Sequence, residues 1–379
     1  MFQRTDAHAA PYSRRCCRSI FTIEGCLARV RRIEKDVDGT PSRKAEHLRI
    51  NLEQDVSGKG VTSGFEAFRF RHCALPEIDL DEVATDCEVF GRRLRAPVLI
   101  SSMTGGAPEA REINRRLALV AQQSGLAMGL GSGRALLEHP NLLPTFDVRA
   151  IAPDSLLFAN LGAVQLNRRY GAAECSKIVE LLQADALILH LNPLQEALQP
   201  EGDTIFRGLL SKIAAVCKAV DFPIVVKEVG WGLSSDVVSA LFDAGVSAVD
   251  IAGAGGTSWS EVERYRLCEP WRVRVAAAFA SWGIPTAEAL ITAREAAPSH
   301  TIFASGGIRD GNDVAKAIAL GADLVGIAAP FLKAAAEGND AGNQCAREII
   351  ETLRIAMFCL GARTLADLRS GSHLYPIQR

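Results

Sequence analysis

The sequence predicts an α/β fold, a (β/α)8 TIM barrel in a single domain with an N-terminal extension, and three observations support this class. From Pro97 onward, eight short apolar runs alternate with helical runs, which is the order of parallel strands joined by right-handed crossovers. The alternative, a doubly wound open sheet, usually has G-x-G-x-x-G after its first strand, whereas here that strand ends in SSMTGG. The length of 379 residues, 48% of them hydrophobic, is sufficient for a barrel core.

The eight strands are predicted from runs rich in β-branched and other apolar residues. In chain order they are PVLIS, AMGLG, LLFANLG, ALILHL, IVVKEV, AVDIAG, TIFASGG and LVGIAA. Helices are predicted where apolar residues recur at helical spacing, over residues 110–124, 173–183, 234–244 and 312–320. A further apolar run, 349–360, predicts a C-terminal helix, so the barrel is expected to span residues 97–371.

The composition argues against several classes of protein. A net charge of -2 and 6% aromatic residues provide neither a basic field nor stacking platforms for nucleic acid. No apolar run reaches the roughly 18 residues of a membrane span. The ten cysteines contain no C-x-x-C pair, as expected for reduced thiols in a cytoplasmic protein. Residues 1–42 are rich in Arg and predict a poorly ordered extension, and Glu24 with later acidic residues argues against a targeting peptide.

Candidate site residues follow the strands, because a barrel of this kind gathers its chemistry at the C-terminal strand ends. After the first strand, Ser102, Met103 and Thr104 precede two glycines and could face a flat heterocycle, although a tight turn explains them equally well. After the second, Ser132 and Arg134 open a helix, and an Arg there suits a phosphate. Taken alone, an exposed Arg at the start of a helix is the plainer interpretation.

The third, fifth and sixth strands end in further polar residues. Asn160 could recognise a donor and acceptor edge, or form an Asx turn. Lys227 follows four apolar residues, and because an unpaired buried ammonium costs several kcal/mol, it indicates either an anionic ligand or an ion pair with Glu228 or another carboxylate. After the sixth strand, Ser258 and Glu261 are predicted to form a capping box.

The last two strands carry the most specific single motif, SGGIRDG. Gly306 and Gly307 offer backbone N–H groups in the loops where such barrels commonly hold a phosphate. With Arg134 as a second phosphate contact, the C-terminal end of the barrel suits a phosphorylated cofactor facing a phosphorylated substrate. FMN fits the phosphate-binding place after the last two strands, and Lys227 would then stabilise negative charge on its reduced ring.

The fourth strand leads into LHLNPLQEALQPEGD, which sets His190, Asn192, Gln195 and Glu196 close together at the end of an apolar run. With this stretch, the chain resembles the type 2, FMN-dependent isopentenyl diphosphate isomerases from Ser42 to about Gly371. The other strings that carry the resemblance are RKAEHL, ALPEIDLDEV, SSMTGG, VVKEVGWG, GAGGTSW, WGIPTAEAL and SGGIRDG.

The resemblance implies an isomerase of isoprenoid biosynthesis. It would interconvert isopentenyl and dimethylallyl diphosphate by a 1,3-allylic proton shift, with reduced FMN as acid and base, Mg²⁺, NADPH to reduce the flavin, and no net redox change. Homo-oligomers, tetramers or octamers, are also implied. Residues 43–96 would form a segment that folds over the barrel mouth, the end where the C-terminal strand ends meet.

The resemblance also assigns individual residues. Gln195 is implied as the catalytic amide and Glu196 as the Mg²⁺ ligand. The implied substrate contacts are Arg43, Lys44, Ser132, Arg134, His190 and Gln195. The implied FMN contacts are Ser102, Met103, Thr104, Ser132, Asn160, Lys227, Thr257, Gly307, Ile308, Arg309, Ala328 and Ala329.

The chain departs from the family pattern at Gly133, where the family usually has Gln. Losing one hydrogen bond to a charged group is worth about 1.5–3 kcal/mol, which predicts a raised Michaelis constant and not an inactive enzyme. The rival interpretation is an FMN-dependent oxidase or dehydrogenase of 2-hydroxy acids. That chemistry needs a His base after the sixth or seventh strand, where this chain has GAGGTSW.

Overall fold

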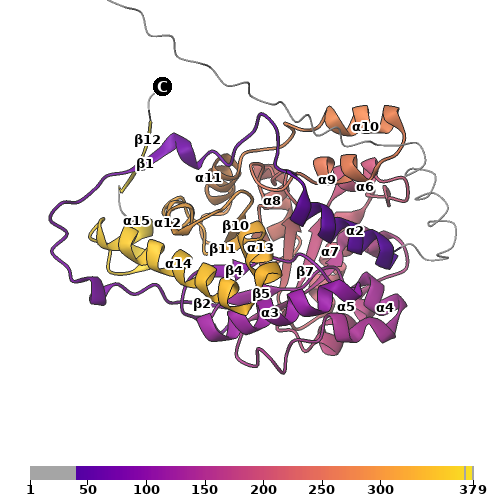
Figure 1. The fold of residues 1–379 in the computed structure, drawn as a ribbon, viewed down its shortest axis with the longest axis horizontal. Coiled ribbons are helices and arrows are strands. Elements are labelled where there is room, and N and C mark those ends of the chain that lie inside the picture. Colours follow the sequence, from indigo (N-terminus) through magenta and orange to yellow (C-terminus); the bar gives the residue numbers. More distant parts are fainter. Residues whose placement is uncertain (1–39, 371–372, 378–379) are drawn as a thin grey trace, which may run out of the picture. The chain divides into compact units, whose positions relative to one another are not determined.

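The eight predicted strands close into a parallel barrel in the computed structural model, which describes residues 40–370 and 373–377 (Figure 1). The barrel runs in sequence order from β4 to β11, and β11 pairs with β4. The predicted fold class is therefore confirmed, and the predicted extension lies outside the described residues as far as residue 39. The barrel strands are β4 (Val98–Ile100), β5 (Ala127–Gly129), β6 (Leu157–Gly162), β7 (Ala186–Leu191), β8 (Ile224–Glu228), β9 (Ala248–Asp250), β10 (Thr301–Ser305) and β11 (Leu324–Ile327).

The strands are apolar on both faces because each face is covered. Alternate side chains point to opposite sides of a strand. One set, including Leu99, Phe158, Ile188 and Phe303, fills the barrel interior, while the other set packs in one large cluster with the helices. This arrangement explains why the strands read as continuous hydrophobic runs.

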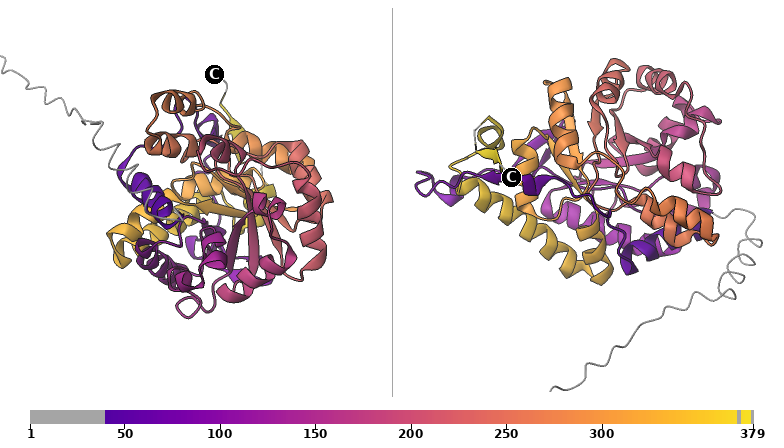
Figure 2. Two further views of the ribbon diagram at one scale, coloured as in Figure 1. Left: turned by 90° about the vertical axis from the view of Figure 1, so that its right-hand side faces the viewer. Right: turned by 90° about the horizontal axis from the view of Figure 1, so that it is seen from above.

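Helices surround the barrel, as Figures 1 and 2 show. The four helices predicted from periodicity are present with bounds within two residues of those expected. The helices after β4 are α3 (Pro108–Ser124), α4 (Arg134–Glu138), α5 (Ala172–Leu182), α6 (Pro193–Leu198), α7 (Leu209–Ala219), α8 (Ser235–Asp243), α9 (Trp259–Arg266), α10 (Pro270–Ala277), α11 (Thr286–Ala296), α12 (Gly311–Ala319), α13 (Ala329–Glu337), α14 (Asn339–Phe358) and α15 (Leu365–Ser370). The long helix α14 packs on α3, α12 and α13 of its own chain.

The segment before the barrel contributes to both of its ends. Helix α2 (Thr40–Glu53) contacts α3, α9 and α13 and brings its side chains to the C-terminal end. The hairpin of β2 (Cys87–Val89) and β3 (Arg92–Leu94) lies at the N-terminal end, where Phe90 stacks edge-on against Phe158 inside the barrel with ring centroids 6.2 Å apart. Strand β1 (Phe68–Phe70) pairs with β12 (Leu374–Pro376) away from the barrel.

The predicted capping box at α9 is wrong. Ser258 is the N-cap residue, but its hydroxyl lies 2.8 Å from the hydroxyl of Ser260 and does not bond the helix backbone. The carboxylate of Glu261 accepts from the guanidinium of Arg264 instead. The guanidinium offers two N–H donors and an opposite charge to the carboxylate, whereas the backbone at the N-cap offers a single uncharged N–H. Across the described ranges, no helix combines the length and apolar character needed to cross a membrane.

Candidate active site

Polar side chains gather at the C-terminal ends of five neighbouring strands. His190 of β7, Lys227 of β8 and Asp250 of β9 occupy the same register position, and Asn160 and Ser305 stand at or near the ends of β6 and β10. Buried polar groups in one layer of a barrel mark its functional end. The barrel mouth is therefore the candidate active site.

Lys227 is held by two buried groups. Its Nζ donates to Oγ of Ser305 over 2.9 Å and lies 3.0 Å from Oδ2 of Asp250. Of the two alternatives for an ion pair, Glu228 or another carboxylate, the structure shows the second, with Asp250 as the partner. The Glu228 carboxylate instead accepts the N–H groups of Val229, Gly230 and Trp231, and burial raises its pKa to about 7.

His190 is neutral at pH 7. Burial, with the positive charges of Lys227 and Lys44, lowers its pKa to about 4. Its Nδ1 lies 2.8 Å from Oδ1 of Asn160, so His190 donates from Nδ1 and keeps Nε2 as an acceptor. This hydrogen bond fixes the imidazole ring beside Lys227.

The loop after β7 places Gln195 against a buried carboxylate from α9. Nε2 of Gln195 donates to Oε1 of Glu263 over 3.2 Å, and the amide of Gln199 donates to the same oxygen over 2.8 Å. His47 of α2 also bonds this oxygen at 3.0 Å, while Arg266 pairs with the other. Glu263 thus holds the amide that the resemblance makes catalytic.

Glu263 is ionised within this network. Burial alone would raise its pKa, but the hydrogen bond from His47, the charge interaction with that imidazole and the charge of Arg266 outweigh burial and lower it to about 2. Burial also lowers the pKa of His47, whose Nε2 lies 3.0 Å from Oε1 of Glu263. Sequence reasoning missed Glu263 because nothing in WSEVERYR separates it from the other acidic residue of its helix.

Both carboxylate oxygens of Glu196 accept hydrogen bonds. Oε1 accepts from Nδ2 of Asn192 at 3.0 Å, and Oε2 accepts the backbone N–H of Asp203 at 2.6 Å. Nδ2 of Asn192 also donates to Gln195, at 3.0 Å, so one amide orients both side chains. Among the described residues, no three His, Cys, Asp or Glu side chains cluster as a metal cage would require. A cation here would need oxygens from a bound ligand, as Mg²⁺ commonly does.

Helix α2 brings two cations to the mouth. Nζ of Lys44 donates to the carbonyl of Ser132 over 2.7 Å and lies 5.2 Å from the ring centre of Phe146. Arg43 lies 3.4 Å from the amide oxygen of Gln199 and 3.6 Å from Glu201. Burial, together with the charges of Arg43 and Arg134, lowers the pKa of Lys44 to about 7. An anion that binds here would meet a concentrated positive charge.

Arg134 lies in the same corner but is already paired. Its Nε donates to Glu138 over 3.1 Å, and Asp203 lies 3.7 Å from its NH1. Gly133, next to it, packs so tightly that an added Cβ would lie 2.5 Å from Cδ1 of Ile178. The space that the family's Gln side chain would need is thus filled in part by Ile178.

The loop after β10 is built for close approach of a ligand to the backbone. Gly306 and Gly307 have φ angles of 105° and 73°, which only glycine adopts readily. An added Cβ on Gly256 would lie 2.5 Å from the backbone nitrogen of Gly307. Arg309 of this loop pairs with Asp313, and its side chain is 71% exposed.

The remaining residues that the resemblance assigns to FMN line the same end of the barrel. Ser102 and Ser101, directly after β4, have buried hydroxyls with no hydrogen-bond partner. Thr104 is buried and Met103 is half-buried. The others in this group are Thr257 beside the glycine-rich loop after β9, Ile308 in the loop after β10, and Ala328 and Ala329 after β11. Orphaned buried hydroxyls indicate that a polar ligand completes this wall.

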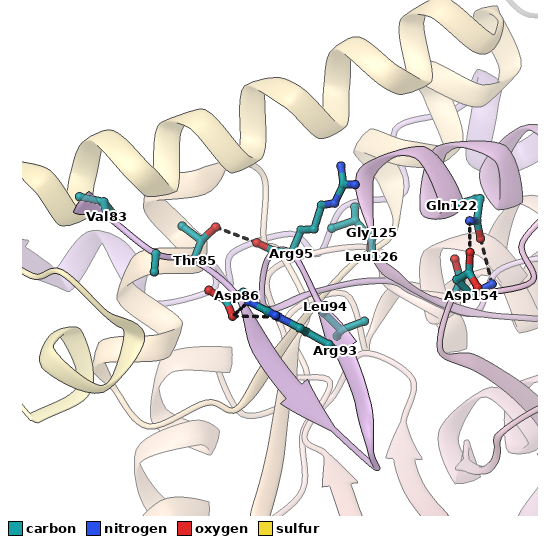
Figure 3. Close-up of a pocket in the computed structure, with 12 residues that line it drawn as sticks. Val83, Thr85, Asp86, Arg93, Leu94, Arg95, Gln122, Gly125, Leu126 and Asp154 are labelled. Carbon is teal, nitrogen blue, oxygen red and sulfur yellow. Dashed lines mark hydrogen bonds and ion pairs between the residues drawn. The ribbon is translucent and has the colours of Figure 1, made fainter. Parts of the chain in front are cut away.

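A cavity of about 570 Å³ lies at the opposite end of the barrel (Figure 3). Its walls come from the residues that precede β4, β5 and β6, including Arg93, Gly125 and Asp154. Arg93 is bound to Asp86, and Asp154 exchanges hydrogen bonds with Gln122. Because it faces the N-terminal strand ends, whereas barrels of this kind carry their chemistry at the C-terminal ends, this cavity is not the candidate active site.

The fold and the mouth define a (β/α)8 barrel with buried Lys, His and amide side chains at its C-terminal end. Residues 193–375 match the family model described as FMN-dependent dehydrogenase. The chain is 54% identical over 336 residues to an isopentenyl-diphosphate delta-isomerase of Synechococcus sp., covering 89% of this chain and 97% of the relative. A protein of the same name from Nostoc sp. is 50% identical and 97% covered. The chain belongs to the isopentenyl-diphosphate delta-isomerase family.

The similarity to solved structures extends the fold comparison. A mandelate oxidase variant with a monooxide FMN adduct matches 92% of this chain and 98% of its own, with a TM-score of 0.59 and 20% sequence identity. At that identity the likeness concerns the barrel fold alone. It does not favour the oxidase as the activity of this chain.

Proposed function

We propose that this protein interconverts isopentenyl and dimethylallyl diphosphate by a 1,3-allylic proton shift, with reduced FMN and without net redox change. The observation that carries the proposal is the match to curated isomerases at 54% and 50% identity over nearly their whole length. The mouth supports it, since it combines a cationic corner on α2 with an amide held by a buried carboxylate.

The residues at the mouth fit FMN. The glycine loop after β10 would let a phosphate reach backbone N–H groups. Ser102, directly after β4, has a buried hydroxyl without a partner, and Lys227 offers a positive charge. When bound and reduced, FMN supplies electron-rich ring atoms that exchange protons with an alkene. Reduction by NADPH belongs to the same proposal.

The substrate diphosphate would bind between α2 and the loops after β5 and β7. Arg43, Lys44 and Arg134 supply positive charge there, and Glu196 would share a Mg²⁺ ion with the diphosphate oxygens. His190 is neutral and keeps Nε2 free for a ligand proton. We further propose a cytoplasmic homo-oligomer.

Gln195 would relay or position the proton that is transferred at the reacting alkene. An amide orients a proton without adding a negative charge that could trap a carbocation. Its oxygen already accepts from Asn192 and its nitrogen donates to Glu263, so the group is fixed before the substrate arrives. At 8% exposure, Gln195 is also shielded from water, which would otherwise capture a cationic intermediate.

The test is anaerobic incubation of the purified protein with isopentenyl diphosphate, Mg²⁺ and FMN, with and without a reductant, following the acid-labile allylic product. Product in the reduced sample alone supports the isomerase and its dependence on reduced flavin. No product in either sample, with FMN bound and lactate or glycolate oxidised, would contradict the proposal and favour a 2-hydroxy acid oxidase.

Arg43→Ala is expected to raise the Michaelis constant for isopentenyl diphosphate about tenfold or more, because a charge-assisted bond to phosphate is worth about 1.5–3 kcal/mol. FMN content should not change, because Arg43 lies on α2 beside Gln199 and Glu201. Arg49→Ala is the matched control, since Arg49 is on the same helix but, within residues 40–370, pairs with the exposed Glu53. Loss of flavin from Arg43→Ala would contradict the assignment to substrate.

Substrate binding is expected to take up protons at pH 8 through Lys44. The pKa of Lys44 is about 7 because of burial and the nearby Arg43 and Arg134, so the amine is mostly neutral at pH 8, and a bound diphosphate would restore its charge. Calorimetry in buffers of different ionisation enthalpy should give an uptake of about 0.9 protons at pH 8 and little at pH 6. Lys44→Met should abolish the uptake, and an unchanged value in that variant would assign it to another group.

A further inference from the structure

Lys227, Asp250 and Ser305 form a closed triangle at the ends of β8, β9 and β10. Nζ of Lys227 donates to the Ser305 hydroxyl at 2.9 Å, that hydroxyl donates to Oδ1 of Asp250 at 2.7 Å, and Oδ2 of Asp250 lies 3.0 Å from Nζ. The side chain of Asp250 has no exposed surface, whereas that of Lys227 keeps 11%. A ligand in the mouth can therefore touch Lys227 but not Asp250.

The triangle fixes the direction of Lys227. An ammonium carries three N–H bonds, and Ser305 and Asp250 lie on one side of it, which leaves an N–H for a ligand. Asp250 itself is anchored, because Oδ1 also accepts the backbone N–H of Ala252 at 3.2 Å. Ala252 has a φ of 37°, a strained conformation that this contact helps to hold at the start of the loop after β9.

We propose that Asp250 is a positioning residue that aims Lys227 at bound FMN and keeps it charged in both redox states of the flavin. The inference rests on the proposed binding of FMN. A buried ammonium with no counter-charge gives up its proton, while a carboxylate 3.0 Å away retains it. With Asp250 present, Lys227 meets oxidised and reduced FMN with the same positive charge.

The consequence is a fixed proton count for flavin reduction. With Lys227 already charged, two electrons and one proton convert bound FMN to a reduced form with one negative charge, which Lys227 balances. In Asp250→Asn, Lys227 is neutral beside oxidised FMN and gains a proton when the flavin becomes anionic. Reduction of the variant then takes two electrons and two protons.

Three other titratable groups face Lys227 or the space next to it. His190 lies beside it on β7, with a pKa of about 4. Glu228 follows Lys227 in the chain, and Lys44 approaches from α2. The pKa of Glu228 and that of Lys44 are both about 7. The range from pH 8 to 9.5 lies above the pKa values of all three, and a Lys227→Met background separates any remaining contribution of these groups from that of Lys227.

The experiment is an anaerobic redox titration of the FMN-loaded protein, using dithionite with indicator dyes, at several pH values from 8 to 9.5. The midpoint potential of the wild type should fall with a slope of one proton per two electrons, and Asp250→Asn should double that slope. Ser305→Ala keeps the charge pair and Glu228→Gln removes the neighbouring carboxyl, so both should keep the wild-type slope.

Each outcome bears on the proposal. A doubled slope in Asp250→Asn that disappears in a Lys227→Met background supports it, and an unchanged slope in folded, flavin-bound Asp250→Asn overturns it. If that variant fails to fold, the wild type still decides, because a slope of two protons there means that Lys227 is not permanently charged. A wild type that binds no FMN overturns the proposed function and this inference together, whereas FMN binding with two protons overturns the inference alone.

Discussion

Gln195→Ala is expected to lower kcat for isopentenyl diphosphate isomerisation by about 10²- to 10⁴-fold, the usual contribution of a positioned proton-transfer group. FMN content should not change, since the amide bonds Glu263 and Asn192 and not the glycine loop after β10. The measurement is single-turnover product formation with prereduced flavin, which separates chemistry from reduction of the cofactor.

Gln199→Ala is the matched control for this prediction. Gln199 is buried like Gln195 and donates to the same oxygen of Glu263, at 2.8 Å, but it also accepts from Arg43. We expect its loss to raise the Michaelis constant through Arg43 and to change kcat less than about tenfold. Equal losses of kcat in the two variants would mean that both amides act only by holding Glu263, and that Gln195 has no role at the alkene.

The barrel and its functional end were predictable because they depend on patterns local in the sequence. Strands buried on both faces read as apolar runs, and helices packed on the barrel show helical spacing. The residues after each strand must then converge, which brings His190 and Lys227 together although 37 positions separate their numbers. The hairpin that closes the other end around Phe90 was not predicted, since its strands, CEV and RRL, carry charged residues and form no apolar run.

The partners of the site residues were not predictable, because they are set by register and helix packing. Lys227 directly precedes Glu228 in the sequence. It nevertheless pairs with Asp250, because these two residues are register partners on the neighbouring strands β8 and β9. Glu263 reaches Gln195 only because α9 packs on α6. A charged residue inside AVDIAG was the one available signal for Asp250, since buried carboxylates are rare unless paired.

Glu263→Gln is expected to destabilise the protein by about 3 kcal/mol at pH 7. The substitution removes the negative charge that Arg266 and three further side-chain donors surround, so the guanidinium of Arg266 loses its counter-charge. The lowered pKa of Glu263 corresponds to a similar loss of stability. A carboxyl with a pKa of about 2 in the folded state and 4.5 as its model value contributes about 3 kcal/mol of stability at neutral pH. The free energy of unfolding in urea measures this difference.

The sign of the pH dependence makes the prediction specific to the charge. Because folding lowers the pKa of Glu263, its contribution is complete above about pH 4.5 and is lost as the pH falls toward 2. The wild type and Glu263→Gln should therefore differ most at pH 7 and converge near pH 2 to 3. Glu269→Gln, at a carboxylate 57% exposed, should cost less than about 1 kcal/mol at any pH. A difference at Glu263 that stays constant from pH 7 to 3 would assign the loss to packing and not to the buried charge.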